Sequence, residues 1–157
     1  MTDVRASLFA VRKAAPRDAL AISAIHGSSF PSPWPLSYWT RTISDPLHRI
    51  YVAAMPGCPP LGYLVARRIV DQAEIISMAV VAGSRRQGVA RGLLDALTED
   101  LCGELPCRLF LEVAADNAAA FELYRRAGFE EIAIRAGYYE RTGAPPVDAR
   151  LLARDLR

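Results

Sequence analysis

The stretch from Arg85 to Leu94, RRQGVARGLL, places two arginines and a glutamine before a glycine and then begins an apolar run. Backbone N–H groups at a helix start carry partial positive charge and lack partners within the helix. Because Gly88 and Ala90 have little or no side chain, an anion can approach the backbone there, and the arginines add charge for phosphate oxygens. The pattern favours a phosphate site. A solvated basic turn before an ordinary helix is the other interpretation.

Two glutamates lie in predicted strands, where a positioned carboxylate can act as a general base. Glu112 lies in LFLEV, where the strand period of two puts it on the face opposite to Leu111 and Val113. Glu74 lies near the start of AEIISMAV. A solvated carboxylate at a strand end is the structural alternative for both. It suits Glu112 less, because the surrounding strand is almost wholly apolar, and we expect few local reasons for a carboxylate there except chemistry.

Hydrophobic periodicity and turn residues predict the elements that position these groups. We expect a helix that Pro16 opens and Gly27 breaks, and a second, short helix that Pro35 opens. Asp116 or Asn117 should begin a further helix, and Gly128 should end it. The clearest helix covers 88–101, where valine and leucine recur every fourth residue. Strands are expected at 7–14, 49–55, 61–70, 73–81, 107–115, 130–139 and 147–155, the last two joined by a loop over 140–146.

The order of these elements predicts one domain over residues 1–157, of the α/β or α+β class, with a central mixed sheet. The segment from 73 to 128 reads strand, turn, helix, strand, helix, which is a crossover unit. The chain has 157 residues, of which 52% are apolar and 23% charged, so a globular fold is expected.

Charge and composition exclude several classes of function. The formal charge is +2 without a clustered basic patch, so we expect no nucleic-acid partner, and no apolar run approaches a membrane span. Three cysteines without regular spacing predict neither a disulfide framework nor a zinc site and indicate a reducing, cytoplasmic setting. With His26 and His48 as the only histidines, we expect no metal and no Ser-His-Asp triad. The N-terminus shows no signal-peptide apolar core.

The spacing Arg85-x-x-Gly88-x-Ala90 resembles the Q/R-x-x-G-x-G/A signature of the GCN5-related N-acetyltransferases. The segments 76–97, 111–129 and 135–149 follow in that family's order, and the resemblance covers nearly the whole chain. Within the family the chain is most similar to the bacterial ribosomal-protein alanine N-acetyltransferases. Its segment FPSPW resembles the F-P-W segment of that group. The resemblance implies a mostly antiparallel central sheet flanked by helices, with acetyl-CoA as co-substrate.

The same resemblance implies roles for individual residues. The acetyl-CoA site it implies comprises Met78, Ala79, Val80, Arg85, Arg86, Gln87, Gly88, Val89, Ala90, Arg91 and Asn117. In the ribosomal-protein branch the general base occupies a position that resembles Glu112. In the histone-acetylating branch it occupies a position that resembles Glu74. Tyr124 is implied to lie near the thioester sulfur. The reference pKa of tyrosine, about 10, exceeds that of a thiol, about 8.5, so proton donation to the thiolate and a hydrogen bond to the sulfur both remain open.

The acceptor is the less determined part of the reaction. Trp34, Tyr138 and Tyr139 lie in aromatic, proline-rich segments that favour a peptide, so we expect an N-terminal α-amine of a protein such as a ribosomal protein. Two departures from the family pattern lie in acceptor segments: Ser32 and Pro33 lengthen the F-P-W segment, and PPVDA replaces a more acidic run. The alternative is a small amine, a polyamine or an aminoglycoside, although no acidic cluster is visible for it. A non-catalytic CoA-binding module is the third possibility.

Overall fold

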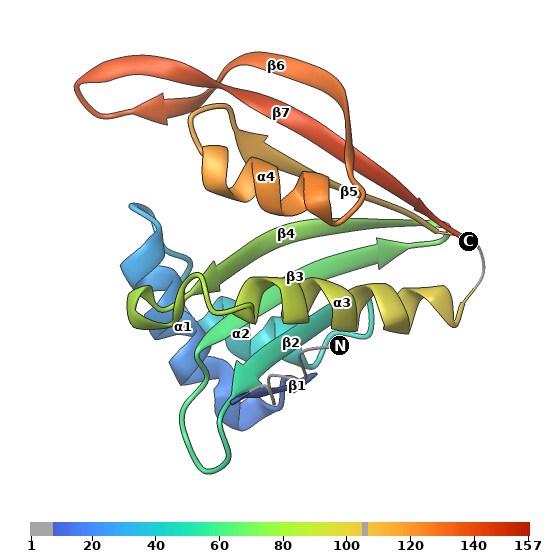
Figure 1. The fold of residues 1–157 in the computed structure, drawn as a ribbon. Coiled ribbons are helices and arrows are strands. Elements are labelled where there is room, and N and C mark those ends of the chain that lie inside the picture. The colour runs from blue at the N-terminus through green and yellow to red at the C-terminus, as the bar shows by residue number, and fades with distance from the viewer. Residues whose placement is uncertain (1–7, 105–106) are drawn as a thin grey trace, which may run out of the picture. The chain divides into compact units, whose positions relative to one another are not determined.

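A computed structural model describes residues 8–104 and 107–157 of the chain, with seven strands and four α-helices among them (Figure 1). The strands are β1 (Ala10–Lys13), β2 (His48–Ala54), β3 (Gly62–Ile69), β4 (Gln72–Val80), β5 (Cys107–Ala114), β6 (Glu130–Arg141) and β7 (Ala144–Leu156). The helices are α1 (Ala19–Ser29), α2 (Leu36–Ile43), α3 (Val89–Cys102) and α4 (Ala118–Arg126), with short 3-10 helices η1 (Pro16–Asp18) and η2 (Ala82–Ser84).

The strands form one mixed sheet in the order β1-β2-β3-β4-β5-β7-β6. β4 and β5 are parallel, whereas β1 with β2, β5 with β7, and β6 with β7 are antiparallel. A parallel pair needs a crossover connection, and α3 provides it between β4 and β5. The predicted α/β class, mixed sheet and crossover are therefore confirmed.

The described residues divide into two compact units. Unit 1 comprises the residues up to Val65 together with Ser77–Leu97, and unit 2 comprises Ala66–Ile76 and Thr98–Arg157. Each unit has its own apolar interior. That of unit 1 includes the fully buried side chains of Ile22, Trp39, Val52, Leu64, Leu93 and Leu97, and that of unit 2 includes Leu101, Leu109, Leu111 and Leu152. The single domain expected over 1–157 stays a prediction.

Helix α1 begins and ends later than the sequence pattern predicts, because Pro16 lies in η1, α1 begins at Ala19, and Gly27 lies inside a helix that ends at Ser29. A single glycine in a helix costs about 1 kcal/mol relative to alanine, which burial of Ile22 and Ile25 can offset. The helix ends before Phe30, which precedes Pro31 and has an extended backbone with φ and ψ of −129° and 140°. A residue before proline is disfavoured in the helical region.

The connection between the last two strands is also shorter than predicted. The expected loop over 140–146 is mostly strand, and β6 and β7 form a long hairpin that turns at Thr142 and Gly143 (Figure 1). Gly143 has a φ of 71°, which glycine adopts without steric cost. The prolines at 145 and 146 are tolerated because the register is irregular between the pairs Tyr139↔Val147 and Arg141↔Ala144.

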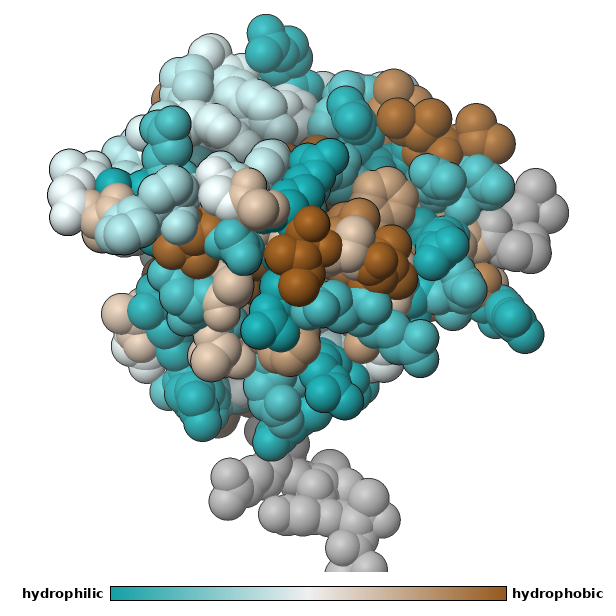
Figure 2. Space-filling view, turned by 90° about the horizontal axis from the view of Figure 1, so that it is seen from above, coloured by the Kyte–Doolittle hydropathy of each residue, from teal (hydrophilic) through white to brown (hydrophobic). Residues whose placement is uncertain are grey.

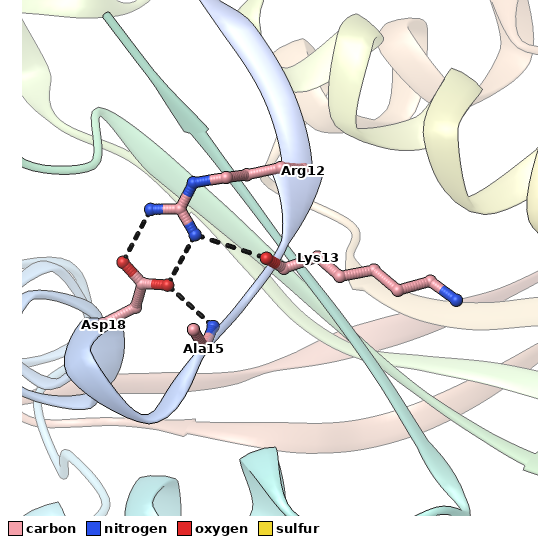
Figure 3. A network of polar contacts seen from close by, with 4 residues as sticks. All are labelled: Arg12, Lys13, Ala15 and Asp18. Atoms are coloured by element: carbon pink, nitrogen blue, oxygen red, sulfur yellow. Dashed lines mark hydrogen bonds and ion pairs between the residues drawn. The ribbon is translucent and has the colours of Figure 1, made fainter. Parts of the chain in front are cut away.

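A buried carboxylate fixes the chain between β1 and α1 (Figure 3). Asp18 is 3% exposed, and its two oxygens accept hydrogen bonds from Arg12 Nη1 and Nη2 at 2.7 and 2.9 Å. The Ala15 N–H donates to Asp18 Oδ2 at 2.7 Å. The Arg12 hydrogen bonds hold the pKa of Asp18 below its ordinary value, with a smaller contribution from the Ala15 N–H. The bidentate pair therefore stabilises the charged carboxylate.

On the face shown in Figure 2, hydrophobic residues occur in small groups among hydrophilic ones. The exposed large hydrophobic side chains include Ile132, Ile134 and Tyr138 of β6, which are about half exposed. Within the described ranges, no helix has the length and apolar character needed to cross a membrane.

Asp18→Ala should lower the free energy of unfolding by about 1–3 kcal/mol at neutral pH, because it leaves the Ala15 N–H and the Arg12 guanidinium without their acceptor. The folded-state pKa of Asp18 is depressed, so its contribution is present above the ordinary carboxyl pKa and is lost as pH falls through the folded value. The difference between wild type and variant, measured by urea unfolding, should therefore shrink below about pH 4.

The matched control is Glu122→Ala, which removes an exposed ion pair with Arg126 on α4. Exposed pairs of this kind contribute about 0.5 kcal/mol or less. Equal losses in the two variants would contradict the role given to Asp18.

Candidate active site

The turn between β4 and α3 has the backbone of an anion site. It passes through η2 and residues 85–88, where Arg86 and Gly88 have φ values of 62° and 84°. A Cβ on Gly88 would meet no heavy atom within 4 Å, so its surroundings are open. The helical hydrogen-bond ladder begins with Gly92 N–H donating to Gly88 O at 2.9 Å. The N–H groups before Gly92 therefore precede the ladder, as an anion site at a helix start requires.

Some polar side chains of this turn form hydrogen bonds within it, and others are exposed to solvent. Arg85 Nε donates to Val80 O at 3.1 Å, and Gln87 Nε2 donates to Gly83 O at 3.1 Å. Both therefore hold the turn together. Arg91 forms an ion pair with Asp95 at 2.9 Å. Arg86 is exposed and has no hydrogen bond or ion pair within the described part of the chain, so its cation is available to a phosphate.

The end of β4 offers backbone groups beyond its pairing with β5. The parallel ladder covers three residue pairs, from Gln72↔Arg108 to Glu74↔Phe110. β4 continues to Val80, so Met78, Ala79 and Val80 lie beyond that ladder. Backbone N–H and C=O groups at a strand edge can pair with an extended ligand as an added strand would. This geometry suits the amide groups of the pantetheine arm of acetyl-CoA.

Glu112 lies in β5 on the face opposite to its buried neighbours, as the alternation predicts. Its side chain is 19% exposed, and its Oε1 lies 2.8 Å from Nη1 of Arg135. Arg135 also provides a structural partner for this carboxylate, from a strand distant in sequence, and the catalytic role of Glu112 stays a prediction. No local pattern indicates this pair, since Arg135 belongs to β6 and meets Glu112 only through the strand order β5-β7-β6.

Unit 2 contains two tyrosines that influence each other, and one of them, Tyr139, lies near this carboxylate. Burial raises the pKa of Tyr139, and the charge of Glu112 raises it further. Tyr124 of α4 is buried, with its ring edge-on to Phe129 at 5.7 Å. Burial also raises the pKa of Tyr124, and Tyr139 adds a smaller effect. Both phenols therefore stay protonated at neutral pH, and the Tyr124 hydroxyl has no hydrogen-bond partner among the described residues.

Asn117 and Glu74 have structural roles that the sequence left open. Asn117 caps α4, and its Oδ1 accepts a hydrogen bond from the Ala120 N–H at 3.1 Å. This decides between Asp116 and Asn117 as the first residue of the helix. Glu74 has a side chain 41% exposed and lies 3.9 Å from Arg67 Nη2. It therefore forms a loose, solvated ion pair.

The aromatic segment before α2 is organised around a histidine that the sequence did not single out for this role. The His26 ring stacks on Trp34, with centroids 4.6 Å apart, and contacts Phe30 at 4.7 Å. His26 Nδ1 lies 2.8 Å from the Tyr63 hydroxyl, which lies 2.8 Å from Ser77 Oγ. Burial lowers the pKa of His26, so the ring is neutral at pH 7. Trp34 is thereby fixed on a buried polar chain of unit 1.

Tyr138 and Tyr139 lie in β6, within the strand that the sequence predicts over 130–139. Between the pairs Arg135↔Ala149 and Tyr139↔Val147 the register shifts, so β6 bulges there. Gly137 has a φ of 60°, and its N–H donates to Asp148 Oδ1 at 2.9 Å. Bulges redirect side chains at sheet edges. The two tyrosine rings contact each other edge-on, with centroids 5.0 Å apart.

Residues 19–129, more than half of the chain, match the model of the acetyltransferase (GNAT) family. The chain belongs to the GNAT acetyltransferase family. Its resemblance to that family is confirmed, as is the predicted enzyme class, an N-acetyltransferase that uses acetyl-CoA. Within the described ranges, no group of three or more metal-ligating side chains is present.

Three proteins illustrate the relationship of this GNAT chain. It is 33% identical to N-alpha-acetyltransferase RimI of Mycobacterium tuberculosis over 127 residues, 78% of this chain and 76% of the relative. It is 39% identical to the ribosomal protein bS18-alanine N-acetyltransferase of Escherichia coli K12 over 80 residues, 51% of this chain and about half (54%) of that protein. The crystal structure of the ribosomal-protein-S18-alanine N-acetyltransferase from Escherichia coli superposes with a TM-score of 0.85 and 27% identity, covering 94% of each chain.

Arg86→Gly should weaken acetyl-CoA binding without lowering the free energy of unfolding. Arg86 has a positive φ that glycine adopts freely, so folding stability should stay equal or rise by up to about 1 kcal/mol. Loss of the cation should weaken acetyl-CoA binding roughly tenfold, the size of one charge-assisted hydrogen bond. Thermal unfolding and calorimetric titration measure the two effects.

Arg17→Ala removes an exposed arginine from η1 and controls for the change in net charge. It should leave acetyl-CoA affinity unchanged. Equal affinity of the Arg86→Gly variant and the wild type would remove Arg86 from the binding site.

Proposed function

We propose that this GNAT enzyme transfers the acetyl group of acetyl-CoA to the N-terminal α-amine of a protein. The similarity that carries the proposal is the 33% identity over 78% of the chain to a protein named as an N-alpha-acetyltransferase. Glu112 is consistent with it, because its side chain is 19% exposed and its carboxylate is therefore partly accessible to an acceptor amine. A ribosomal protein is the proposed acceptor, after the bS18-alanine enzyme of Escherichia coli.

Acetyl-CoA is proposed to bind by its pyrophosphate at the turn before α3 and by its pantetheine arm at the end of β4. Support comes from the N–H groups before Gly92, the exposed Arg86 and the strand residues beyond the β4–β5 ladder. The internal bonds of Arg85 and Gln87 assign these two side chains to shaping the turn. Asn117 is proposed to contact the CoA arm, and this proposal rests on the family resemblance alone.

Glu112 is proposed as the base. The α-amine titrates near pH 8, so part of it is protonated at neutral pH and must lose a proton before its lone pair can attack. In the proposed step Glu112 accepts that proton, directly or through a water. The amine nitrogen then bonds to the thioester carbonyl carbon, the C–S bond breaks to release CoA thiolate, and the remaining surplus proton on the nitrogen passes to the thiolate through solvent, which leaves the amide and CoA thiol. Glu74 is a weaker candidate, because it is more exposed and is paired loosely with Arg67.

Tyr124 is proposed to stabilise the leaving thiolate through a hydrogen bond without giving up its proton. The reference pKa of tyrosine already exceeds that of a thiol, and burial raises the pKa of Tyr124 further. Full proton transfer to sulfur therefore becomes more unfavourable. The hydroxyl keeps its donor for the substrate, since no described residue accepts a hydrogen bond from it.

The acceptor is proposed to contact Trp34, Tyr138 and Tyr139, since rigid aromatic rings provide contact area at low entropic cost. Trp34 is held by its stack on His26, and the tyrosines are held by the β6 bulge. A polyamine or aminoglycoside would need surplus negative charge, and Glu112 is already neutralised by Arg135. A peptide is therefore the better supported acceptor. The cytoplasmic location stays a prediction.

Glu112→Gln should abolish the function in cells and reduce kcat by about a hundredfold to ten-thousandfold at neutral pH, because glutamine keeps the shape but cannot accept the proton. In a strain that lacks the protein, the wild type should restore acetylated N-terminal peptides in mass spectra and the variant should not. In vitro, acetyl-CoA affinity should hold, and the kinetic deficit should shrink at higher pH, where more amine is neutral.

Glu74→Gln is the control and should retain most activity. If Glu74→Gln proves inactive while Glu112→Gln stays active, the base is Glu74 and the proposed assignment is wrong. If the deletion strain and the wild type show the same acetylated N-terminal peptides, the proposal that the acceptor is a protein is wrong.

Tyr124→Phe should lower kcat by roughly tenfold to a hundredfold, the effect of losing one hydrogen bond to a charged sulfur. Because burial keeps the phenol protonated, the wild-type rate should show no loss attributable to tyrosine ionisation up to about pH 10. A kcat profile from pH 7 to pH 10 tests this. A decline with an apparent pKa near 9 in the wild type that disappears in Tyr124→Phe would indicate proton donation instead.

A further inference from the structure

The imidazole of His26 occupies a position where a purely apolar ring would be more favourable for stability. Its side chain lies among aromatic rings and is 3% exposed. Nδ1 lies 2.8 Å from the Tyr63 hydroxyl, whereas Nε2 is buried and has no hydrogen-bond partner in the described part of the chain. A buried polar atom without a partner lowers stability. Because a phenylalanine of similar size would avoid this cost, we expect the imidazole to have a role besides packing.

The Tyr63 hydroxyl joins this imidazole to strand β4. It lies 2.8 Å from His26 Nδ1 and 2.8 Å from Ser77 Oγ, and the Tyr63 side chain is fully buried. A phenol between two such partners can donate one hydrogen bond and accept the other, whichever tautomer the imidazole adopts. Buried polar groups that bond to one another specify a single arrangement. The bond to Tyr63 therefore holds the imidazole against rotation, which an apolar ring at the same position would not resist.

Trp34 lies on the imidazole that is held in this way. Its ring is inclined to that of His26 by 26°, with centroids 4.6 Å apart. Its contacts with Tyr38 and Trp39 are more tilted, at 48° and 41°. Trp34 is half-buried and stands between two prolines, whose fixed φ restricts the backbone on either side. The indole therefore has one stacking partner, and the plane of that partner sets the plane of the indole.

We propose that His26 and Tyr63 are positioning residues for the acceptor, because the hydrogen bond between them sets the plane on which Trp34 stacks. The inference rests on the proposed contact between Trp34 and the acceptor peptide. An indole already held in its binding orientation loses little entropy when a peptide packs against it, and this strengthens acceptor binding. Both positioning residues and Trp34 belong to unit 1. Neither His26 nor Tyr63 contacts the reacting atoms.

His26→Phe and Tyr63→Phe break the same hydrogen bond from its two ends and leave an aromatic ring in place. The probe is a synthetic peptide with the N-terminal sequence of ribosomal protein bS18 from the same organism. Each variant should raise the KM for this peptide about three- to tenfold, the effect of one lost hydrogen bond. The kcat and the KM for acetyl-CoA should stay within about twofold of the wild type, because the proposed CoA contacts are backbone groups that begin at Met78.

The double variant His26→Phe/Tyr63→Phe should raise the peptide KM no more than the larger of the two single effects, because only one bond is lost. For His26→Phe the midpoint of thermal unfolding should not fall, since the unpaired Nε2 is removed with the imidazole. Tyr51→Phe is the matched control. Tyr51 lies in β2, next to β3, and is 4% exposed, so this variant loses a buried hydroxyl but keeps the bond between His26 and Tyr63. It should keep the wild-type peptide KM.

Three results would overturn the positioning role and leave the N-terminal acetyltransferase intact. These are an unchanged peptide KM in His26→Phe or Tyr63→Phe, an equal rise in the KM for acetyl-CoA, and additive effects in the double variant. If Trp34→Ala keeps the wild-type peptide KM, the acceptor contact on which the inference rests is wrong. If the wild type acetylates neither this peptide nor any other protein N-terminus, the proposed function fails, and this inference fails with it.

Discussion

Parallel strands cannot be joined by a tight hairpin, so the pairing of β4 with β5 obliges the chain to leave the sheet after Val80 and return at Cys107. Helix α3 is that return path. Its start lies directly after the strand, so N–H groups without helical partners follow the end of β4. The ladder with β5 ends at Glu74, and the rest of β4 keeps backbone groups beyond it. One topological requirement therefore produces both features proposed to hold acetyl-CoA.

The turn that starts this crossover is held by its own side chains. Arg85 and Gln87 donate to carbonyls of the segment that precedes them, and two residues take positive φ. At Gly88 the left-handed conformation is adopted without strain, whereas at Arg86 it costs free energy. Strained backbone at a non-glycine residue is more common at functional sites than elsewhere. The proposed phosphate contact of Arg86 gives this strain a function.

In unit 2 the carboxylate of the proposed base has a cationic partner, and two of the phenols are at least partly buried. Glu112 is balanced by Arg135, and Tyr124 and Tyr139 stay protonated because burial raises the pKa of each. In unit 1 the buried His26 stays neutral and contacts Tyr63, which in turn contacts Ser77. Buried polar groups with hydrogen-bond partners specify a single packing arrangement. The aromatic segment around Trp34 is thereby held on a defined support.

The sequence by itself determined the local elements and the chemistry of the acetyl donor. The four-residue spacing of Leu93 and Leu97, the alternation around Glu112 and the cap at Asn117 are signals within a few residues, and the structure confirms each. Such signals are readable because helix and strand periods act over short distances. The family signature around Gly88 has the same local character, and it led to the enzyme class that the comparisons confirm.

Only the tertiary structure decided the contacts between distant residues. The stack of His26 on Trp34 depends on how the segment after α1 folds back, and the His26–Tyr63–Ser77 chain joins one helix and two strands. The pair of Glu112 with Arg135 requires β7 to lie between β5 and β6 and requires the observed register. A shift of register by one residue would turn either side chain to the other face of the sheet. Strand order and register arise from the packing of the whole chain, and so no local pattern encodes the partner of Glu112.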